Sequence, residues 1–165
     1  MASLTAGTFL MKGVTSGGTT TYTKYIDISE YPDIGSTVGT QDVTSLTDAC
    51  HKYIEALPDP GGSMTFNGFL NDTDYASVQT DAGTEMPLAI AFGGAIDVND
   101  PTKWAPEALS VSGGSVTKGA NTFLVVFFTG KVRVRLTGAG TDAARPVEYT
   151  VTFTSGITDH NGDML

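Results

Sequence analysis

The sequence contains few of the residues that build metal and redox sites. Among its 165 residues there is one cysteine, Cys50, and there are two histidines, His51 and His160. A single cysteine excludes a disulfide within the chain and fits a reducing compartment. One cysteine and two histidines also fall short of the ligand set and spacing of a zinc site. We therefore expect neither a disulfide nor a zinc centre.

Positive charge is scarce as well. The chain carries 9 Lys and Arg residues against 18 Asp and Glu, which gives a net charge of -9. Tight binding to a phosphate backbone requires clustered cations. The charge balance therefore weighs against a protein that holds nucleic acid tightly.

Long apolar runs are absent. The longest nearly apolar run, residues 86–96, contains one proline and two glycines. It is far shorter than the roughly 18 residues that a membrane span needs. The first residues, MASLTAGTFLMKG, place no basic region before an apolar segment, so we expect no secretory signal. The sequence predicts a soluble protein that is made in a cytoplasm and has no membrane partner.

The motifs of the common enzyme classes are missing too. There is no G-x-S-x-G, the GAGTDA stretch lacks the third glycine of a dinucleotide loop, and TGKV lacks the upstream glycine of a phosphate loop. The acidic stretches 97–101 and 159–163 resemble parts of calcium loops without the complete spacing, and solvated turns are the default interpretation. We expect no catalytic, cofactor-binding or metal-binding residues, and a protein that is not an enzyme.

Threonine, valine and glycine, by contrast, are abundant, and this composition favours strands and turns. The strongest strand signal is TFLVVFFTGKVRVRL, residues 122–136, with a continuously apolar first half and a strictly alternating second half. We expect it to form an antiparallel hairpin with the strand that begins at Val147. A second hairpin is predicted from residues 50–57 and 63–70, which flank the turn sequence PDPGG.

One helix is predicted after the capping sequence Asn71-Asp72-Thr73, ending at Gly83. The fold expectation is mainly β with one α-helix, as two packed antiparallel sheets (a β-sandwich or barrel-like arrangement) and a flanking helix. The length fits a single domain, 1–165. Within it we expect three irregular segments: a flexible N-terminal arm at 1–18, an extended inter-strand loop at 29–48 and a C-terminal tail at 157–165. Residues 97–122 are predicted as loops with one short strand.

Charge is distributed unevenly along the chain. Residues 25–107 contain fourteen acids and two cations, whereas residues 118–145 contain five cations and one acid. Three of these cations, Lys131, Arg133 and Arg135, share one face of a predicted strand. Like charges on one face repel, so either nearby carboxylates such as Glu148 or solvent offset them, or the face meets an acidic surface on another copy. A head-to-tail contact of that kind generates rings or filaments.

The order of features between residues 21 and 156 resembles that of a known family. The stretch TYTKYIDISEYPDIGSTVGTQDVTSLTDACHKYIEALPDPGGSMTFNGFLNDTDYASV has an early strand, a Pro-Gly break, an Asp-Val-Thr segment at 42–44, a turn at 59–62 and a short Tyr-containing helix. FFTGKV and a hairpin ending in Thr-Ser-Gly follow. This order is similar to that of the tail tube (major tail) proteins of long, non-contractile-tailed bacteriophages and their prophage relatives. Glu55 and Ala56 stand where those relatives tend to carry a glycine.

The resemblance implies a structural virion protein. Six copies form a ring, rings stack into a tail tube, and the genomic DNA passes through the lumen without specific binding. The implied partners are further copies of the chain and the tape measure, tail terminator and baseplate proteins of the tail. The implied location is the virion, after assembly in the host bacterial cytoplasm, and no cofactor is implied.

Several residues are candidates for these contacts. We expect the loop 29–48 to reach the neighbouring ring, with Asp42 and Thr44 near the contact. Lys131, Arg133 and Arg135 are the candidates for a subunit interface with an acidic surface. Glu55 and Asp59, on a strand and turn assigned to the inner sheet, are the candidates for lumen-facing acids that repel phosphate.

The alternative function is a carbohydrate-binding or adhesin-like β-sandwich module. It rests on two aromatic residues expected in loops, Tyr31 and Trp104, and on acidic turns that would hold calcium.

Overall fold

Strands account for most of the fold, as the β-branched composition predicts. The computed structural model describes residues 7–97, 100–138, 140–141 and 143–165. Within these residues there is one helix, α1 (Asp72–Asp81), and there are thirteen strands. The strands are β1 (Thr8–Ser16), β2 (Thr19–Ile26), β3 (Thr40–Asp42), β4 (Tyr53–Glu55), β5 (Ser63–Phe69), β6 (Glu85–Gly93), β7 (Ala95–Asp97), β8 (Asp100–Ala105), β9 (Leu109–Ser112), β10 (Ser115–Lys118), β11 (Thr122–Leu136), β12 (Pro146–Phe153) and β13 (Thr158–Asp159).

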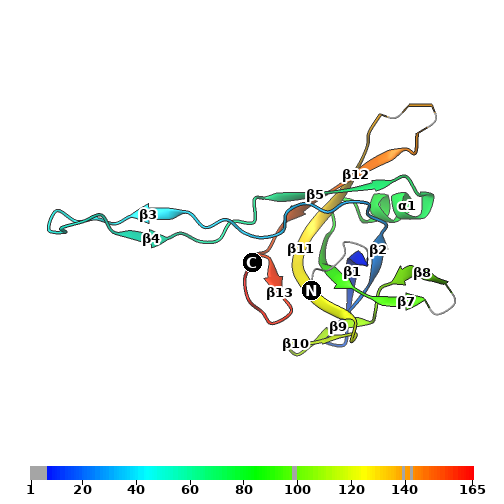
Figure 1. The fold of residues 1–165 in the computed structure, drawn as a ribbon, viewed down its shortest axis with the longest axis horizontal. Coiled ribbons are helices and arrows are strands. Elements are labelled where there is room, and N and C mark those ends of the chain that lie inside the picture. Colours follow the sequence, from blue (N-terminus) through cyan, green and yellow to red (C-terminus); the bar gives the residue numbers. More distant parts are fainter. Residues whose placement is uncertain (1–6, 98–99, 139, 142) are drawn as a thin grey trace.

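The main sheet is antiparallel and strongly curved. Its strand order is β10-β9-β2-β1-β6-β11-β12-β5, and β13 pairs with β11. The long strand β11 pairs with β6 up to Lys131 and with β12 from Gly130 onward, and Figure 1 shows it curving through the body. The strands on its two sides therefore face each other as packed layers. This confirms a mainly β, barrel-like fold of packed antiparallel sheets with one helix, and β11 joins the two layers.

The curvature of β11 depends on a close approach of two backbones. A Cβ added to Gly130 would lie 2.6 Å from the carbonyl oxygen of Thr152 on β12. Only glycine fits where β11 passes from one neighbour to the other. The exchange falls between the apolar first half and the alternating second half of β11.

Two apolar clusters hold the layers together. The larger one lies between the layers and includes Phe66 and Tyr149 on one side and Leu10, Leu88 and Ile90 on the other. The smaller one covers the opposite face of the central strands. Its buried residues are Phe9, Met11, Tyr22, Ala89, Ala91, Leu109 and Val125. Neighbouring residues of β6 and β11 point alternately into the two clusters, which is why these strands are apolar on both faces.

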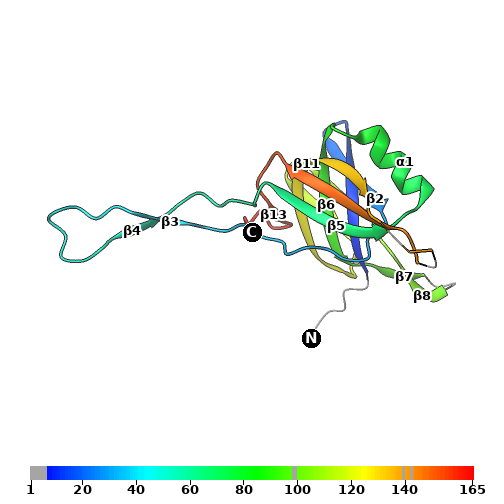
Figure 2. The ribbon, with the colours of Figure 1, turned by 90° about the horizontal axis from the view of Figure 1, so that it is seen from above.

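The helix α1 lies at one side of the body, as Figure 2 shows. The side chain of Asn71 accepts a hydrogen bond from the amide of Thr73 at 2.9 Å, which is the predicted N-cap. Asp74 Oδ2 accepts the amide of Asp27 at 2.8 Å, and Val78 is fully buried. The predicted helix is confirmed, and polar contacts attach much of it to the body.

The predicted N-terminal arm, residues 1–18, is wrong over the residues that the structure describes. Residues 8–16 form β1, which pairs with β2 and β6 in the middle of the sheet. Its side chains Leu10 and Met11 are buried. The short apolar stretch at this position is therefore a core strand. Residues 1–6 lie outside the described part of the chain.

The C-terminal segment 157–165 is also part of the folded body. Ile157 is fully buried, and β13 pairs with β11. The amide of Leu165 donates to the carbonyl of Ile157 at 3.0 Å. The segment therefore closes on itself and does not extend away as a tail.

Two further strand predictions need correction. Strand β4, within residues 50–57, pairs with β3, whereas β5, within 63–70, pairs with β12, so they do not form a hairpin together. The region 97–122 contains three strands, β8, β9 and β10. Of these, β9 and β10 form a hairpin around Gly113 and Gly114, both at positive φ, the turn chemistry that two-residue hairpins require.

The most extended feature is an arm, defined here as residues 35–62. In both views it projects from the body along the long axis (Figures 1 and 2). Strands β3 and β4 pair inside it, and the amides and carbonyls of Thr37 and Asp59 exchange two bonds of 2.9 Å at its base. No residue of the arm is buried. The arm continues the excursion that the sequence places at residues 29–48 and extends it to residue 62.

Candidate assembly surfaces

The arm exposes apolar side chains to an unusual degree. Of the eleven exposed large hydrophobic residues in the described part of the chain, six lie in the arm. These six are Val38, Val43, Leu46, Tyr53, Ile54 and Leu57. A two-stranded ribbon is marginally stable by itself, because it has no core to bury. Exposed apolar patches of this kind occur at protein–protein and membrane contact sites and in ligand-binding grooves.

The tip of the arm is ordered by hydrogen bonds around Asp42 and Thr44. Asp42 Oδ1 accepts the amide of Thr44 at 2.9 Å and also its hydroxyl, and Asp42 Oδ2 lies 3.2 Å from His51 Nδ1. The hydroxyl of Thr44 accepts the amide of Lys52 at 2.9 Å. The bonds from Thr44 hold the pKa of Asp42 below its ordinary value, so this carboxylate is charged at neutral pH. The structure thus brings together the two predicted arm residues.

The register of β3 and β4 divides the arm into two faces. Asp42 lies opposite Tyr53, and Thr40 lies opposite Glu55. Because alternate residues of a strand point to the same side, these four side chains share one face. We call this the acidic face of the arm. Ile54 and its opposite residue, Gln41, belong to the other face.

Glu55 and Asp59 were expected on a strand and a turn of an inner sheet, and neither belongs to the main sheet. That they face a lumen stays a prediction. Glu55 lies in β4 and pairs with β3, which is separate from the main sheet. Asp59 closes the base of the arm against Thr37, and its side chain accepts the amide of Gly61 at 2.9 Å. Both residues therefore belong to the arm. The alternation of side chains in the sequence does not specify which strand pairs with β4.

The three predicted cations of β11 share one exposed face, which we call the cation row: Lys131, Arg133 and Arg135. Between them, Val132 is fully buried on the opposite face. Arg135 Nη1 lies 3.7 Å from Glu148, the predicted neighbouring carboxylate, in an ion pair that is open to solvent. The row is thus a surface feature of the body.

Arg133 also has a contact inside the chain. A Cβ on Gly83 would lie 3.2 Å from its Nη2, so the guanidinium lies against the end of α1. The last turn of α1 contains no basic residue of its own. A cation near the C-terminal end of a helix is stabilising, and β11 supplies one from outside the helix.

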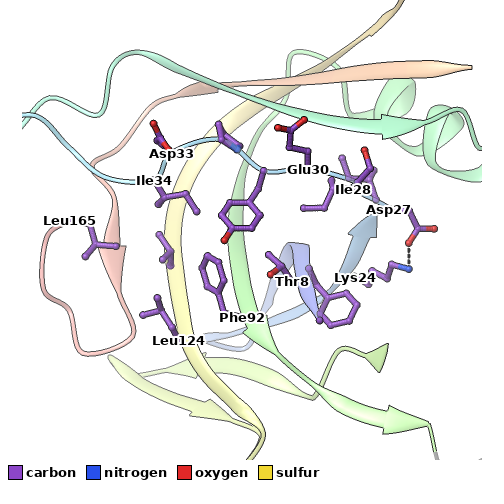
Figure 3. A pocket seen from close by; sticks show the side chains of 17 residues that line it. Thr8, Lys24, Asp27, Ile28, Glu30, Asp33, Ile34, Phe92, Leu124 and Leu165 are labelled. Carbon is purple, nitrogen blue, oxygen red and sulfur yellow. Dashed lines mark ion pairs between the residues drawn. The ribbon is translucent and has the colours of Figure 1, made fainter. Parts of the chain in front are cut away.

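A groove lies where the arm leaves the body. It has a volume of about 1040 Å³ and is lined by residues 27–34, the ends of β1 and β2, and Leu165. Figure 3 shows Phe92, Leu124 and Ile34 along it, with the Lys24–Asp27 ion pair at one end. The ring of Tyr31 packs edge-on against Phe92 with centroids 5.4 Å apart. Sequence reasoning missed this groove because its walls come from segments far apart in the chain.

Other candidate sites are less developed. Among the described residues, no group of three or more His, Cys, Asp and Glu side chains is arranged to hold a metal ion. In the acidic stretch 159–163, one oxygen of Asp159 accepts the amides of Asn161 and Asp163 at 2.8 and 2.9 Å, which is a turn. Trp104 lies in β8 and not in a loop. No helix in the described residues has the length and apolarity to cross a bilayer.

Comparison with protein-family models and with curated protein sequences gives no match for this chain.

Proposed function

We propose that this protein is the tail tube subunit of a long, non-contractile-tailed bacteriophage or a related prophage. Copies join into hexameric rings, and the rings stack into the tube of the virion through which the genome leaves. The observation that carries the proposal is the arm, a long ribbon that projects from a barrel-like body with its apolar side chains exposed.

A tube needs contacts within each ring and contacts between rings. The arm supplies a contact of the second kind, because it reaches beyond the body along the long axis. Its apolar side chains have no core of their own to enter. Burial of one such side chain against a neighbour contributes about 1.5–3 kcal/mol, so several of them together are needed to offset the roughly 4–15 kcal/mol that association costs.

The ends of the main sheet supply the contact within a ring. Strands β10 and β5 stand at the two ends of the strand order. In the described part of the chain, no strand pairs with the outer edge of β10, and residues 29–30 bond the outer edge of β5 only near Asn67. Open edges join sheets of neighbouring copies by strand pairing. Sheets joined around a ring give a wide barrel, because the diameter grows with the number of strands.

The charge of the chain fits a DNA conduit. At a net charge of -9 the tube repels phosphates and avoids the cation contacts that would hold a sliding genome in place. In this role the protein has no cofactor and catalyses no reaction. Its partners are further copies and the tape measure, tail terminator and baseplate proteins.

Electron microscopy of the purified protein tests the proposal. We expect hollow rings or tubes at high protein concentration. Replacing residues 38–58 with Asn-Gly closes the ladder directly after the Thr37–Asp59 pair with a two-residue turn. This variant should keep the far-ultraviolet circular dichroism of the body and lose the ability to stack. A wild-type protein that stays monomeric, or an armless variant that forms normal tubes, contradicts the proposal. Glycan binding by a persistent monomer identifies the carbohydrate-binding alternative.

A further inference from the structure

The arm points away from the body, and the cation row lies on β11 within the body. Figures 1 and 2 both show β3 and β4 projecting to one side along the long axis, away from β11. The arm therefore meets a cation row only on another copy. Such a head-to-tail contact generates rings or filaments, and a stack of rings uses the open, repeating kind.

The charges of the two surfaces are opposite. The arm carries four carboxylates against one lysine, and the cation row carries three positive side chains on one strand face. The four carboxylates are Asp42, Asp48, Glu55 and Asp59. Asp48 pairs with Lys52 and its side chain is only 13% exposed, and Asp59 holds a turn. The Asp42 side chain, although bonded within the arm tip, is 47% exposed. Asp42 and Glu55 are the two acids of one face, so they are the pair that a partner surface meets.

The spacing of the charges also agrees. Asp42 and Glu55 occupy diagonal positions on neighbouring strands, a separation of about 7–8 Å between Cα atoms. Alternate residues of one strand, such as Lys131 and Arg133, are about 6.8 Å apart. Two carboxylates of the arm therefore reach two successive cations of the row. Tyr53, on the same face and 60% exposed, offers its ring to an arginine.

We propose that the acidic face of the arm docks on the cation row of a second copy, with Asp42 and Glu55 paired to its lysine and arginines. This inference rests on the proposed function, since it names the surface that receives the arm in the next ring. It gives Glu55 a role in assembly in place of a role in the lumen. The hydrogen bonds from Thr44 hold the Asp42 carboxylate in one orientation before the arm docks.

Charge exchange tests the docking. The arm variant is Glu55→Lys, and Asp42 is left unchanged because it also orders the arm tip. The body variant combines Lys131→Glu with Arg135→Glu, and Arg133 is left unchanged because it contacts the end of α1. Each variant alone should raise the protein concentration needed for tube formation by about tenfold or more, and the combined chain should recover most of that loss. Asp163→Lys makes the same change of charge as the arm variant elsewhere on the body, and Arg145→Glu makes half the change of the body variant. Both should have little effect.

Cross-linking tests the contact without relying on assembly yields. Cys50 is exposed and is first replaced by serine. Copies with Glu55→Cys are then mixed with copies that carry cysteine at position 131, 133 or 135. A bifunctional thiol cross-linker that spans about 10 Å, the distance between packed strand faces, should link at least one pair. Copies with Asp163→Cys serve as the unlinked control.

The outcomes separate the two proposals. Normal wild-type tubes with no recovery in the combined chain and no cross-link overturn the docking surface and leave the tail tube function in place. A wild-type chain that forms neither rings nor tubes overturns both. Recovery together with a cross-link between copies supports the contact.

Discussion

The hydroxyl of Tyr25 on β2 donates a hydrogen bond to Asp81 Oδ2 at 3.0 Å, and this bond fastens the last residue of α1 to the sheet. The ammonium of Lys12 on β1 lies 2.7 Å from the same oxygen. Because α1 buries few apolar side chains, these polar contacts position the helix more than packing does.

Asp81→Ala should destabilise the monomer by about 1–3 kcal/mol, because it leaves the partly buried groups of Tyr25 and Lys12 without their acceptor. Tyr25→Phe removes only one donor and should cost about 0.5–1.5 kcal/mol. Urea unfolding of an armless variant, free of assembly, measures both. Asp163→Ala removes an exposed carboxylate as the control. Equal stability of Asp81→Ala and this control would show that α1 is held by other contacts.

Alkaline pH should weaken the fold through the same residue. Burial, and then the bond to and the charge of Asp81, raise the pKa of Tyr25 above its ordinary value of 10.0. The folded state therefore favours the neutral phenol, so its stabilisation is complete below about pH 10 and is lost as the pH rises further. Between about pH 8 and pH 11, the free energy of unfolding measured with urea should decrease less in Tyr25→Phe than in the wild type. Identical pH dependence in the two chains would contradict this assignment.

Gly130→Ala should be among the most destabilising small substitutions. The added methyl meets the carbonyl oxygen of Thr152 at 2.6 Å, where backbone and not a flexible side chain would have to move. The expected cost is about 1–3 kcal/mol, as for other overpacked sites. Gly138→Ala is the matched control, because nothing lies within 4 Å of its added Cβ. The comparison uses urea midpoints, and similar midpoints for the two variants would refute the claim that β11 needs this close approach.

Local sequence signals correctly predicted the elements whose structure is determined by residues close together in the chain. The strict alternation at residues 131–136 and the strand after Val147 gave the β11–β12 hairpin, with Val132 inside and Lys131 outside. The capping sequence at Asn71 located the start of α1. The alternation of a strand and the hydrogen bond of a helix N-cap both involve residues only a few positions apart, so the sequence shows them directly.

Pairing between distant strands could not be predicted in this way. The stretch around Tyr53 has the alternation of a strand, but alternation does not specify a partner, and β4 pairs with β3 in place of β5. Because the pairing partner of β4 could not be predicted, Glu55 was expected in an inner sheet. Asp42 and Thr44 were singled out by the Asp-Val-Thr segment at 42–44, whereas the shared face of Asp42 and Glu55 appears only once the register is known.

Arg133 and Lys131 of the cation row stabilise the monomer through different neighbours. Arg133→Glu places an acid at the C-terminal end of α1 and removes a cation that is worth about 0.3–1 kcal/mol there. We expect the melting temperature of the armless monomer to fall by about 2–4 °C for each 1 kcal/mol that is lost. Lys131→Glu, two residues earlier on the strand, lies opposite Glu85 of β6. Two facing carboxylates repel, so the melting temperature should fall by a similar or smaller amount.

In the full-length chain both reversals should weaken assembly, because both charges belong to the surface that meets the arm. Wild-type assembly, followed by light scattering between about 50 mM and 500 mM salt, should decline as salt rises, since screening shortens the reach of exposed charges. Lys131→Glu should lower assembly at low salt and flatten this dependence, because one attractive pair becomes repulsive. Assembly that ignores salt, or that Lys131→Glu leaves unaltered, would mean that the arm docks through its apolar side chains alone.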